Sequence, residues 1–173
     1  LENYRYFRSK LEVSTKLLVL VKANAYGHGA VQFASLMEEA GADYLAVAYP
    51  IEGIELRQAG IKSPIMVLTA GTDSFEQIVN YGLEPGIPNM YSLKILCDVL
   101  EKRGLKGFPI HIKLDTGMHR LGFMTEEMLE LIDFLQTCKA VKVKSVYSHL
   151  AAADDPCCDD FTRTGAAFPR ECR

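Results

Sequence analysis

Short runs of apolar residues recur along the chain and are separated by longer amphipathic stretches. The runs predict six strands, at residues 17–22, 44–48, 64–69, 83–87, 110–114 and 142–147. Most of them are near-continuous, as in LLVLV at 17–21, rather than strictly alternating. Strands buried on both faces of a parallel sheet have this pattern, whereas half-solvated antiparallel strands alternate.

The stretches between these strands predict five helices, at residues 29–40, 51–59, 74–81, 92–103 and 125–138. Glycine follows four of them, at positions 41, 60, 82 and 104. A glycine in the left-handed conformation commonly ends a helix. The repeated order of strand, helix, glycine and strand therefore predicts an α/β architecture.

Two α/β folds fit this order. A doubly wound sheet requires a glycine-rich phosphate loop directly after its first strand, and a (β/α)8 barrel requires eight units in about 250 residues. Six strands in about 150 residues give about 25 residues per unit, close to the roughly 31 of a barrel. Periodicity alone does not decide between the two folds.

The composition is that of one globular domain. The chain has 173 residues, 49% of them hydrophobic and 24% charged, and cores usually remain single up to about 250 residues. The net charge of −3 argues against a nucleic-acid-binding protein, which needs a basic face. The longest apolar run, at 17–21, is far shorter than the ~20 residues of a membrane-spanning helix.

The cysteines and the first residues bear on location. Five cysteines lack the spacing of a disulfide framework and predict reduced thiols in the cytoplasm. The chain opens with LENYR, without the basic and then apolar start of a signal peptide. Because it does not begin with Met, we expect it to be a piece of a longer protein.

Polar side chains follow three predicted strands at their carboxyl ends, where parallel α/β folds place their active sites. Lys22 ends the first strand and Tyr26 comes after it, Lys113 lies in the fifth strand with Arg120 after it, and His149 follows the sixth. Together they predict a cationic, aromatic-containing site suited to an anionic, planar ligand that carries an aldehyde. A lysine removed from water beside other cations is neutral more often and can attack such a carbonyl. Most lysines at strand ends, however, are solvated surface charges.

Three segments make the sequence similar to bacterial alanine racemases. Residues 21–30 (VKANAYGHGA) resemble that family's pyridoxal-phosphate attachment motif, residues 113–123 (KLDTGMHRLGF) its second signature and residues 148–154 (SHLAAAD) its third. The segments have the family's order and spacing, and the resemblance covers residues 1–163. It implies a partial TIM (β/α)8 barrel with about six of the eight βα units and without the family's C-terminal β-domain.

The resemblance also implies a role for each matching residue. Lys22 would hold pyridoxal 5'-phosphate covalently and act as the base on one face of the substrate's α-carbon, and Tyr26, one helical turn further on, would bond the phosphate. Arg120 would donate to the phenolic oxygen of the cofactor, and His149 would lie against its ring. Lys113 matches a position that is commonly carbamylated, and the carbamate would orient Arg120. The implied activity is the interconversion of L- and D-alanine for peptidoglycan synthesis.

Other parts of the family enzyme have no counterpart here. Racemisation needs bases on both faces of a planar carbanion, and in the family the second is a tyrosine from the partner subunit of a homodimer. We therefore expect the isolated chain to be inactive, and marginally stable or oligomeric because a barrel without its last strands has open edges. Residues 164–173 depart from the family pattern and are interpreted as a tail left by truncation or cloning. The parent is a stand-alone racemase or a fusion with a cell-wall ligase.

Other interpretations of the whole chain stay open. A single-domain protein of the pyridoxal-phosphate homeostasis type shares the barrel and the lysine, and a non-catalytic barrel module would keep the lysine without using it. The GHG at 27–29 is weak support for a dinucleotide site. Adjacent Cys157 and Cys158 do not predict a metal site, because vicinal cysteines do not easily bind one zinc together.

The individual site residues also have structural interpretations. Tyr26 could pack the barrel rim, Arg120 could pair with Asp115, and His149 could be a hydrogen-bonded core histidine. His28 and His119 are expected to make local hydrogen bonds within their loops.

Overall fold

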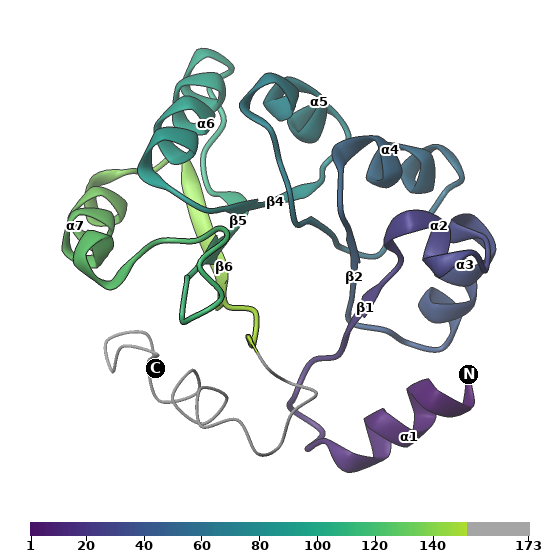
Figure 1. Ribbon diagram of the computed structural model, residues 1–173. Helices are drawn as coiled ribbons and strands as arrows, with labels where there is room; N and C mark the ends of the chain where they lie inside the picture. Colours follow the sequence, from purple (N-terminus) through teal and green to yellow (C-terminus); the bar gives the residue numbers. More distant parts are fainter. Residues whose placement is uncertain (152–173) are drawn as a thin grey trace. The chain divides into compact units, whose positions relative to one another are not determined.

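The computed structural model describes residues 1–151, in which helices and strands alternate (Figure 1). Six strands pair in parallel, in the same order as along the chain. They are β1 (Leu18–Leu20), β2 (Tyr44–Val47), β3 (Ile65–Val67), β4 (Glu84–Ile87), β5 (Phe108–Lys113) and β6 (Val141–Tyr147). The α/β architecture and all six predicted strands are confirmed, with differences of one to two residues at most strand ends.

The helices between the strands are also those that the pattern predicts. They are α3 (Ala30–Glu39), α4 (Pro50–Gln58), α5 (Phe75–Asn80), α6 (Met90–Lys102) and α7 (Met128–Thr137), and the 3-10 turns η1 (Thr72–Ser74) and η2 (Thr125–Glu127) precede α5 and α7. The glycines at 41, 60, 82 and 104 have φ between +57° and +93°, so each adopts the expected left-handed conformation. Within residues 1–151, none of the helices has the length and apolar character needed to cross a bilayer.

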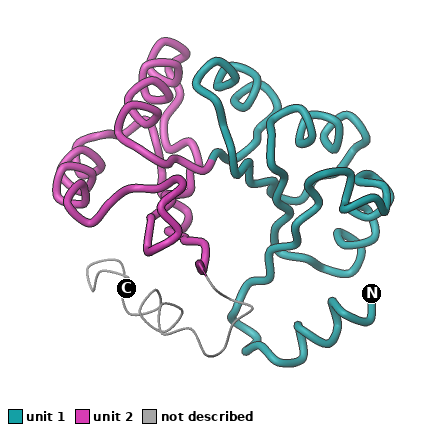
Figure 2. The backbone as a smooth tube through the Cα atoms, viewed as in Figure 1, with its two compact units in different colours: residues 1–85 teal, residues 86–173 magenta. Residues whose placement is uncertain are grey.

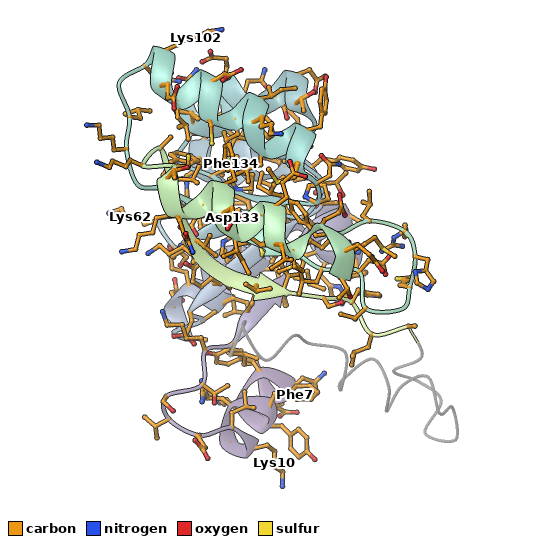
Figure 3. The ribbon with its side chains drawn as sticks, turned by 90° about the vertical axis from the view of Figure 1, so that its left-hand side faces the viewer. Phe7, Lys10, Lys62, Lys102, Asp133 and Phe134 are labelled. Atoms are coloured by element: carbon orange, nitrogen blue, oxygen red, sulfur yellow. The ribbon has the colours of Figure 1, made fainter. Side chains whose placement is uncertain are left out.

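The structure contains two further helices that the sequence pattern does not predict. The first, α1 (Glu2–Lys10), buries none of its residues. Phe7 projects from it with 59% of its surface exposed (Figure 3). Because hydrophobic periodicity reports burial, a helix that buries nothing gives no such signal. The second, α2 (Lys22–Tyr26), replaces the expected end of the first strand and is described with the site.

The chain divides into two compact units, residues 1–85 and residues 86–173 (Figure 2). In the first unit, Leu45 and Val47 of β2 and Ile65 of β3 are fully buried, together with Leu56 of α4 and Phe75 of α5. Full burial of one such side chain contributes about 1.5–3 kcal/mol. These two strands are buried on both faces, as the sequence pattern predicts. The same prediction is wrong for β1, in which Leu18 and Leu20 are 38% and 39% exposed.

Two charged side chains fix the connection between α4 and β3 in the first unit. The Arg57 guanidinium donates to the carbonyl oxygens of Ile61 and Ser63, each at 2.8 Å. The Glu38 carboxylate accepts a hydrogen bond from the Ser63 hydroxyl at 2.7 Å. That hydrogen bond is the main cause that lowers the pKa of Glu38, with burial opposing it. The turn is therefore held by polar contacts that carry no hydrophobic signal.

In the second unit, β5 pairs with β6, with a shift of register between Ile110 and His111. Helix α6 buries Leu93, Leu96 and Leu100, and Lys102 marks its carboxyl end (Figure 3). Strand β4 contributes to both units, since Glu84 and Pro85 pair with β3 and the next two residues pair with β5. The carboxyl ends of β5 and β6 carry the second and third family-like segments.

Candidate functional site

The backbone turns into an unusual conformation directly after β1. Val21 is fully buried and Lys22 is half-buried. Ala23, Asn24, Ala25 and Tyr26 then all have φ between +51° and +54°. A left-handed turn of residues with a Cβ costs about 1–2 kcal/mol per residue, and such strain is concentrated at functional sites. The expectation of an ordinary helical turn between Lys22 and Tyr26 is therefore wrong, because the turn has the opposite hand.

Hydrogen bonds hold the left-handed turn in place. The Asn24 carbonyl accepts from the backbone N–H groups of Gly27 at 3.0 Å and Gly29 at 3.1 Å. The Asn24 side chain accepts from the N–H of Ala30, at the start of α3, at 2.8 Å. Asparagine tolerates the left-handed region better than most residues because its short amide bonds to nearby backbone. The Asn24 amide thus connects the turn after Lys22 to the helix that follows.

Glu52 of α4 anchors the same turn and has no place in the sequence-based site. Its carboxylate accepts backbone hydrogen bonds from Ala23 at 2.7 Å, Ala48 at 2.7 Å and Tyr49 at 3.0 Å. The residue next to Lys22 is therefore tied to the end of β2 and the start of α4. The only sequence signal for this role is that Glu52 stands two residues after the proline that starts the helix. That pattern is common at helix starts and does not by itself indicate a functional site.

Replacement of Glu52 by glutamine is expected to destabilise the chain by about 2 kcal/mol, because an amide group replaces an oxygen that faces N–H donors. The Glu55→Gln variant is the matched control, since Glu55 is exposed on the same helix, and its effect should stay within about 0.5 kcal/mol. Urea unfolding measures both changes. Equal effects of the two substitutions would show that Glu52 is not an anchor.

Tyr26 and His28 lie beside this turn. Tyr26 is 60% exposed, and it lines a cavity of about 520 Å³ together with Ala25, His28 and Phe33. The Nδ1 atom of His28 lies 3.0 Å from the Ala25 carbonyl oxygen, so the expected local hydrogen bond is confirmed. The Tyr26 hydroxyl is thus accessible to a ligand within the first unit.

In the second unit, Lys113 is a buried cation near the end of β5. It is 8% exposed. Burial lowers the pKa of its ammonium group, the Arg120 guanidinium lowers it further, and Asp115 opposes both. The ammonium form of Lys113 is therefore less strongly favoured than that of a solvated lysine. A lysine with a lowered pKa carries more of the neutral, nucleophilic amine than a solvated lysine at the same pH.

The loop after β5 is folded around Asp115. The Asp115 carboxylate accepts from the backbone N–H groups of His119 at 2.9 Å and Gly117 at 3.1 Å. It also lies 3.4 Å from Nδ1 of His119, so the expected local contact of that histidine is confirmed. Burial raises the pKa of Asp115, but these hydrogen bonds and the His119 ring outweigh it and lower the pKa. The structure places the ring of His119, rather than the Arg120 guanidinium, within 4 Å of the Asp115 carboxylate.

The sequence-predicted residues of the second unit come together at one hollow. Lys113, Arg120 and His149 line it with Ser148, and both Arg120 and His149 are exposed. The Ser148 hydroxyl donates to the Leu114 carbonyl at 3.0 Å and lies 2.6 Å from the Thr116 hydroxyl. These bonds join the ends of β5 and β6. The alternative of a buried core histidine at position 149 is wrong, because the His149 side chain is exposed.

Lys22 and Tyr26 belong to the first unit, where they follow β1. Lys22 is half-buried, which is less than the full removal from water that the sequence interpretation assumed. In the part of the chain that the structure describes, no three His, Cys, Asp or Glu side chains gather as metal ligands. Cys157, Cys158 and the tail 164–173 lie outside the described residues.

Tyr147 has a buried hydroxyl with no hydrogen-bond partner among residues 1–151, and burial raises the pKa of its phenol. The Tyr147→Phe variant is expected to be more stable by about 1 kcal/mol, because it removes a polar group whose burial is not compensated. The control is Tyr44→Phe, whose hydroxyl donates to Glu84 at 3.2 Å; it should lose about 1 kcal/mol. Thermal unfolding compares them, and a loss of stability in both would contradict the prediction.

Comparison with known proteins adds sequence and structural relatives. The family model for the N-terminal domain of alanine racemase matches residues 1–172. The chain is 43% identical over 156 residues to an alanine racemase of Synechocystis, covering 89% of this chain and 42% of the relative. It is 40% identical to an alanine racemase of Methanococcus maripaludis, covering 97% and 44%. The chain thus spans less than half the length of these relatives.

Solved structures give the same result for the fold. An alanine racemase of Clostridium difficile 630 superposes with a TM-score of 0.90 at 32% identity, covering 95% of this chain and 43% of that one. A Bacillus anthracis alanine racemase with bound L-Ala-P superposes with a TM-score of 0.87 at 27% identity, covering 96% and 43%. The partial barrel expected from the sequence is confirmed, and the doubly wound alternative is wrong.

Proposed function

We propose, from the premise that this chain belongs to the alanine racemase N-terminal domain family, that it is the cofactor-binding part of a pyridoxal-phosphate-dependent alanine racemase. The whole enzyme would interconvert L- and D-alanine in the cytoplasm and supply the D-isomer for peptidoglycan. The observation that carries the proposal is a lysine directly before a left-handed turn that Asn24 and Glu52 hold by hydrogen bonds.

The described residues fit the cofactor. Pyridoxal 5'-phosphate presents an aldehyde, a phosphate and a phenolic oxygen. The Lys22 amine suits the aldehyde, the Tyr26 hydroxyl can donate to the phosphate, and the Arg120 guanidinium suits the phenolic oxygen, while the exposed His149 can lie against the ring. When bound, the cofactor supplies the electron sink that stabilises a carbanion at the α-carbon.

Lys22 has two tasks in this proposal. Its Nζ atom holds the cofactor, and the same amine then takes the α-proton from one face of the substrate. Both tasks require that the backbone at Lys22, from which the side chain extends, be held in one position. Glu52 and Asn24 hold it there by fixing the backbone on the carboxyl side of Lys22. We assign these two residues to positioning rather than to catalysis.

Lys113 is proposed to be carbamylated. Burial and Arg120 lower the pKa of its amine, and the neutral form of that amine adds to carbon dioxide, forming a carbamate and releasing one proton. The modification replaces a cation by an anion beside the Arg120 guanidinium. The repulsion between the two groups becomes an attraction, and the carbamate can then hold and orient Arg120 through charge-assisted hydrogen bonds.

The chain supplies one of the two bases that racemisation needs. A base on the opposite face must come from elsewhere, and we propose the family's arrangement, a tyrosine from the partner subunit of a homodimer. We further propose that residues 1–163 form the barrel part and that residues 164–173 do not belong to it. The 173-residue chain alone is accordingly expected not to racemise alanine.

Formation of D-alanine tests the function. The whole protein, supplied with pyridoxal phosphate and L-alanine, is expected to bring both isomers to equal concentrations, which chiral chromatography can follow. The 173-residue chain under the same conditions is expected to form no D-alanine. A whole protein that forms none would contradict the proposed function, and racemisation by the short chain would contradict the need for a second subunit.

A further inference from the structure

Two free thiols from different helices meet in the second unit. Cys97 lies on α6, and Cys138 directly follows α7, the neighbouring helix in Figure 1. Their Sγ atoms are 3.3 Å apart. A disulfide bond is about 2.05 Å long, so the sulfurs would need to approach by only about 1.2 Å to form one.

The two thiols differ in their exposure to solvent. Cys97 is 4% exposed, whereas Cys138 is half-buried and lines a pocket of about 340 Å³. Lys106 and Lys139 line the same pocket, and Glu101 is the one acidic residue among its lining residues. The pocket is thus lined by more positive than negative side chains, and it opens on Cys138 and not on Cys97.

The backbone allows the small movement that a bond requires. Cys138 is the residue that ends α7, with extended dihedrals of φ −78° and ψ 112°. Residues at a helix end shift at lower cost than those within it, because fewer hydrogen bonds depend on their position. Cys97 sits in the middle of α6 and is expected to stay in place.

We propose that Cys97 and Cys138 form a redox modification site, a dithiol that an anionic low-molecular-weight disulfide converts into an intrachain disulfide. In the first step the Cys138 thiolate attacks the small disulfide, forms a mixed disulfide and releases one small thiolate. In the second step Cys97 Sγ attacks Cys138 Sγ, the Cys97 proton passes to the leaving sulfur, and a second small thiol departs. The two protein thiols are oxidised and the small disulfide is reduced to two thiols.

The roles of the two cysteines follow from their surroundings. Burial raises the pKa of the Cys97 thiol, and the adjacent Cys138 sulfur raises it further. Because the thiolate is the attacking species, Cys97 is a poor first nucleophile. Once Cys138 carries the mixed disulfide, proximity makes Cys97 the effective attacking group.

The new bond would link positions separated by 41 residues in sequence. That stretch contains all of β5 and the loop around Asp115. A bond that closes a loop of this length restricts the unfolded chain and so favours the folded one. Oxidation is therefore expected to make the second unit more resistant to unfolding, without any change in the residues assigned to the cofactor.

The test uses the full chain with Cys157, Cys158 and Cys172 replaced by serine, and glutathione disulfide as the probe. Peptide mapping by mass spectrometry should show a Cys97–Cys138 link. The thermal midpoint should rise by about 5 °C or more and fall back on reduction. The oxidation equilibrium constant should be at least about tenfold larger in buffer than in denaturing urea. An equal or smaller constant in buffer would overturn the proposal.

Single substitutions in the same background separate the two roles. The Cys97→Ser variant should accumulate the mixed disulfide on Cys138, since the attacking thiol is gone. The Cys138→Ser variant should leave Cys97 unmodified, since the buried thiol is not reached. Comparable rates of modification in the two variants would show that the pocket does not direct the reagent, and would contradict the proposal.

Discussion

Replacement of Lys22 by alanine is expected to abolish covalent capture of pyridoxal phosphate by the chain and to lower racemase activity of the whole protein by about 10³-fold or more. The variant removes both the amine that holds the cofactor and the base that takes the proton. None of the residues of the left-handed turn that follows Lys22, Ala23 to Tyr26, carries a side-chain amine. Absorbance of the bound cofactor and D-alanine formation measure the two losses.

The matched control for this result is Lys62→Ala. Lys62 is exposed in the connection between α4 and β3 of the same unit, and its replacement should change neither quantity. Circular dichroism of both variants shows whether the fold is retained, since the Lys22 side chain is half-buried. A folded Lys22→Ala variant that still captures the cofactor covalently would contradict the assignment of this lysine.

Replacement of Gly122 by alanine is expected to destabilise the second unit by about 3 kcal/mol or more. A Cβ at this position would lie 2.5 Å from the Asp115 nitrogen and 2.5 Å from the Leu114 carbonyl carbon. These are backbone atoms and cannot move aside as a flexible side chain could. The residue also has φ of +137°, which side chains disfavour. Urea unfolding measures the loss.

The physical reason lies in the way the Asp115 loop closes. Asp115 donates its N–H to the Phe123 carbonyl at 2.9 Å, and Phe123 donates its N–H to the Lys113 carbonyl at 2.8 Å. Gly122 lies inside this pair of bonds. Separation of the two segments would therefore displace the loop that carries Arg120.

Gly104→Ala is the control for this second result. Gly104 also has a positive φ, of +67°, but a Cβ there would meet nothing within 4 Å. Its replacement should cost only about 1 kcal/mol, from backbone conformation alone. If both glycine variants lose the same stability, the close approach at Gly122 does not matter and the structure of the loop is wrong.

The parts of the fold that bury apolar surface were predictable from the sequence. The strand at 64–69 and the helix at 92–103 are examples, since residues such as Ile65 and Leu96 are buried where the periodicity places them. The glycines after helices were predictable for a different reason, because a left-handed residue is needed there whatever surrounds it. By contrast, α1 buries nothing and leaves no pattern to detect.

The site was predictable in its residues but not in its geometry. Lys113 and Arg120 are at one hollow, as their positions at the end of one strand predict. The left-handed turn after Lys22 has no comparable signal, because alanine at positions 23 and 25 favours the right-handed helix. Glu52 was missed because its contact with the turn is to the backbone N–H of Ala23, 29 positions away, while its other two partners are the local contacts of an ordinary helix start.

The most direct measurement of the central claim is to map where pyridoxal phosphate attaches to the unaltered chain. The protein is incubated with the cofactor, reduced with borohydride to make the link permanent, digested and examined by mass spectrometry. We predict that the modification is found on the peptide that contains Lys22, at about one group per chain, and that a molar excess of free lysine present during the incubation does not prevent it. No modification, or a modification shared among exposed lysines such as Lys62 and Lys102, would contradict the account.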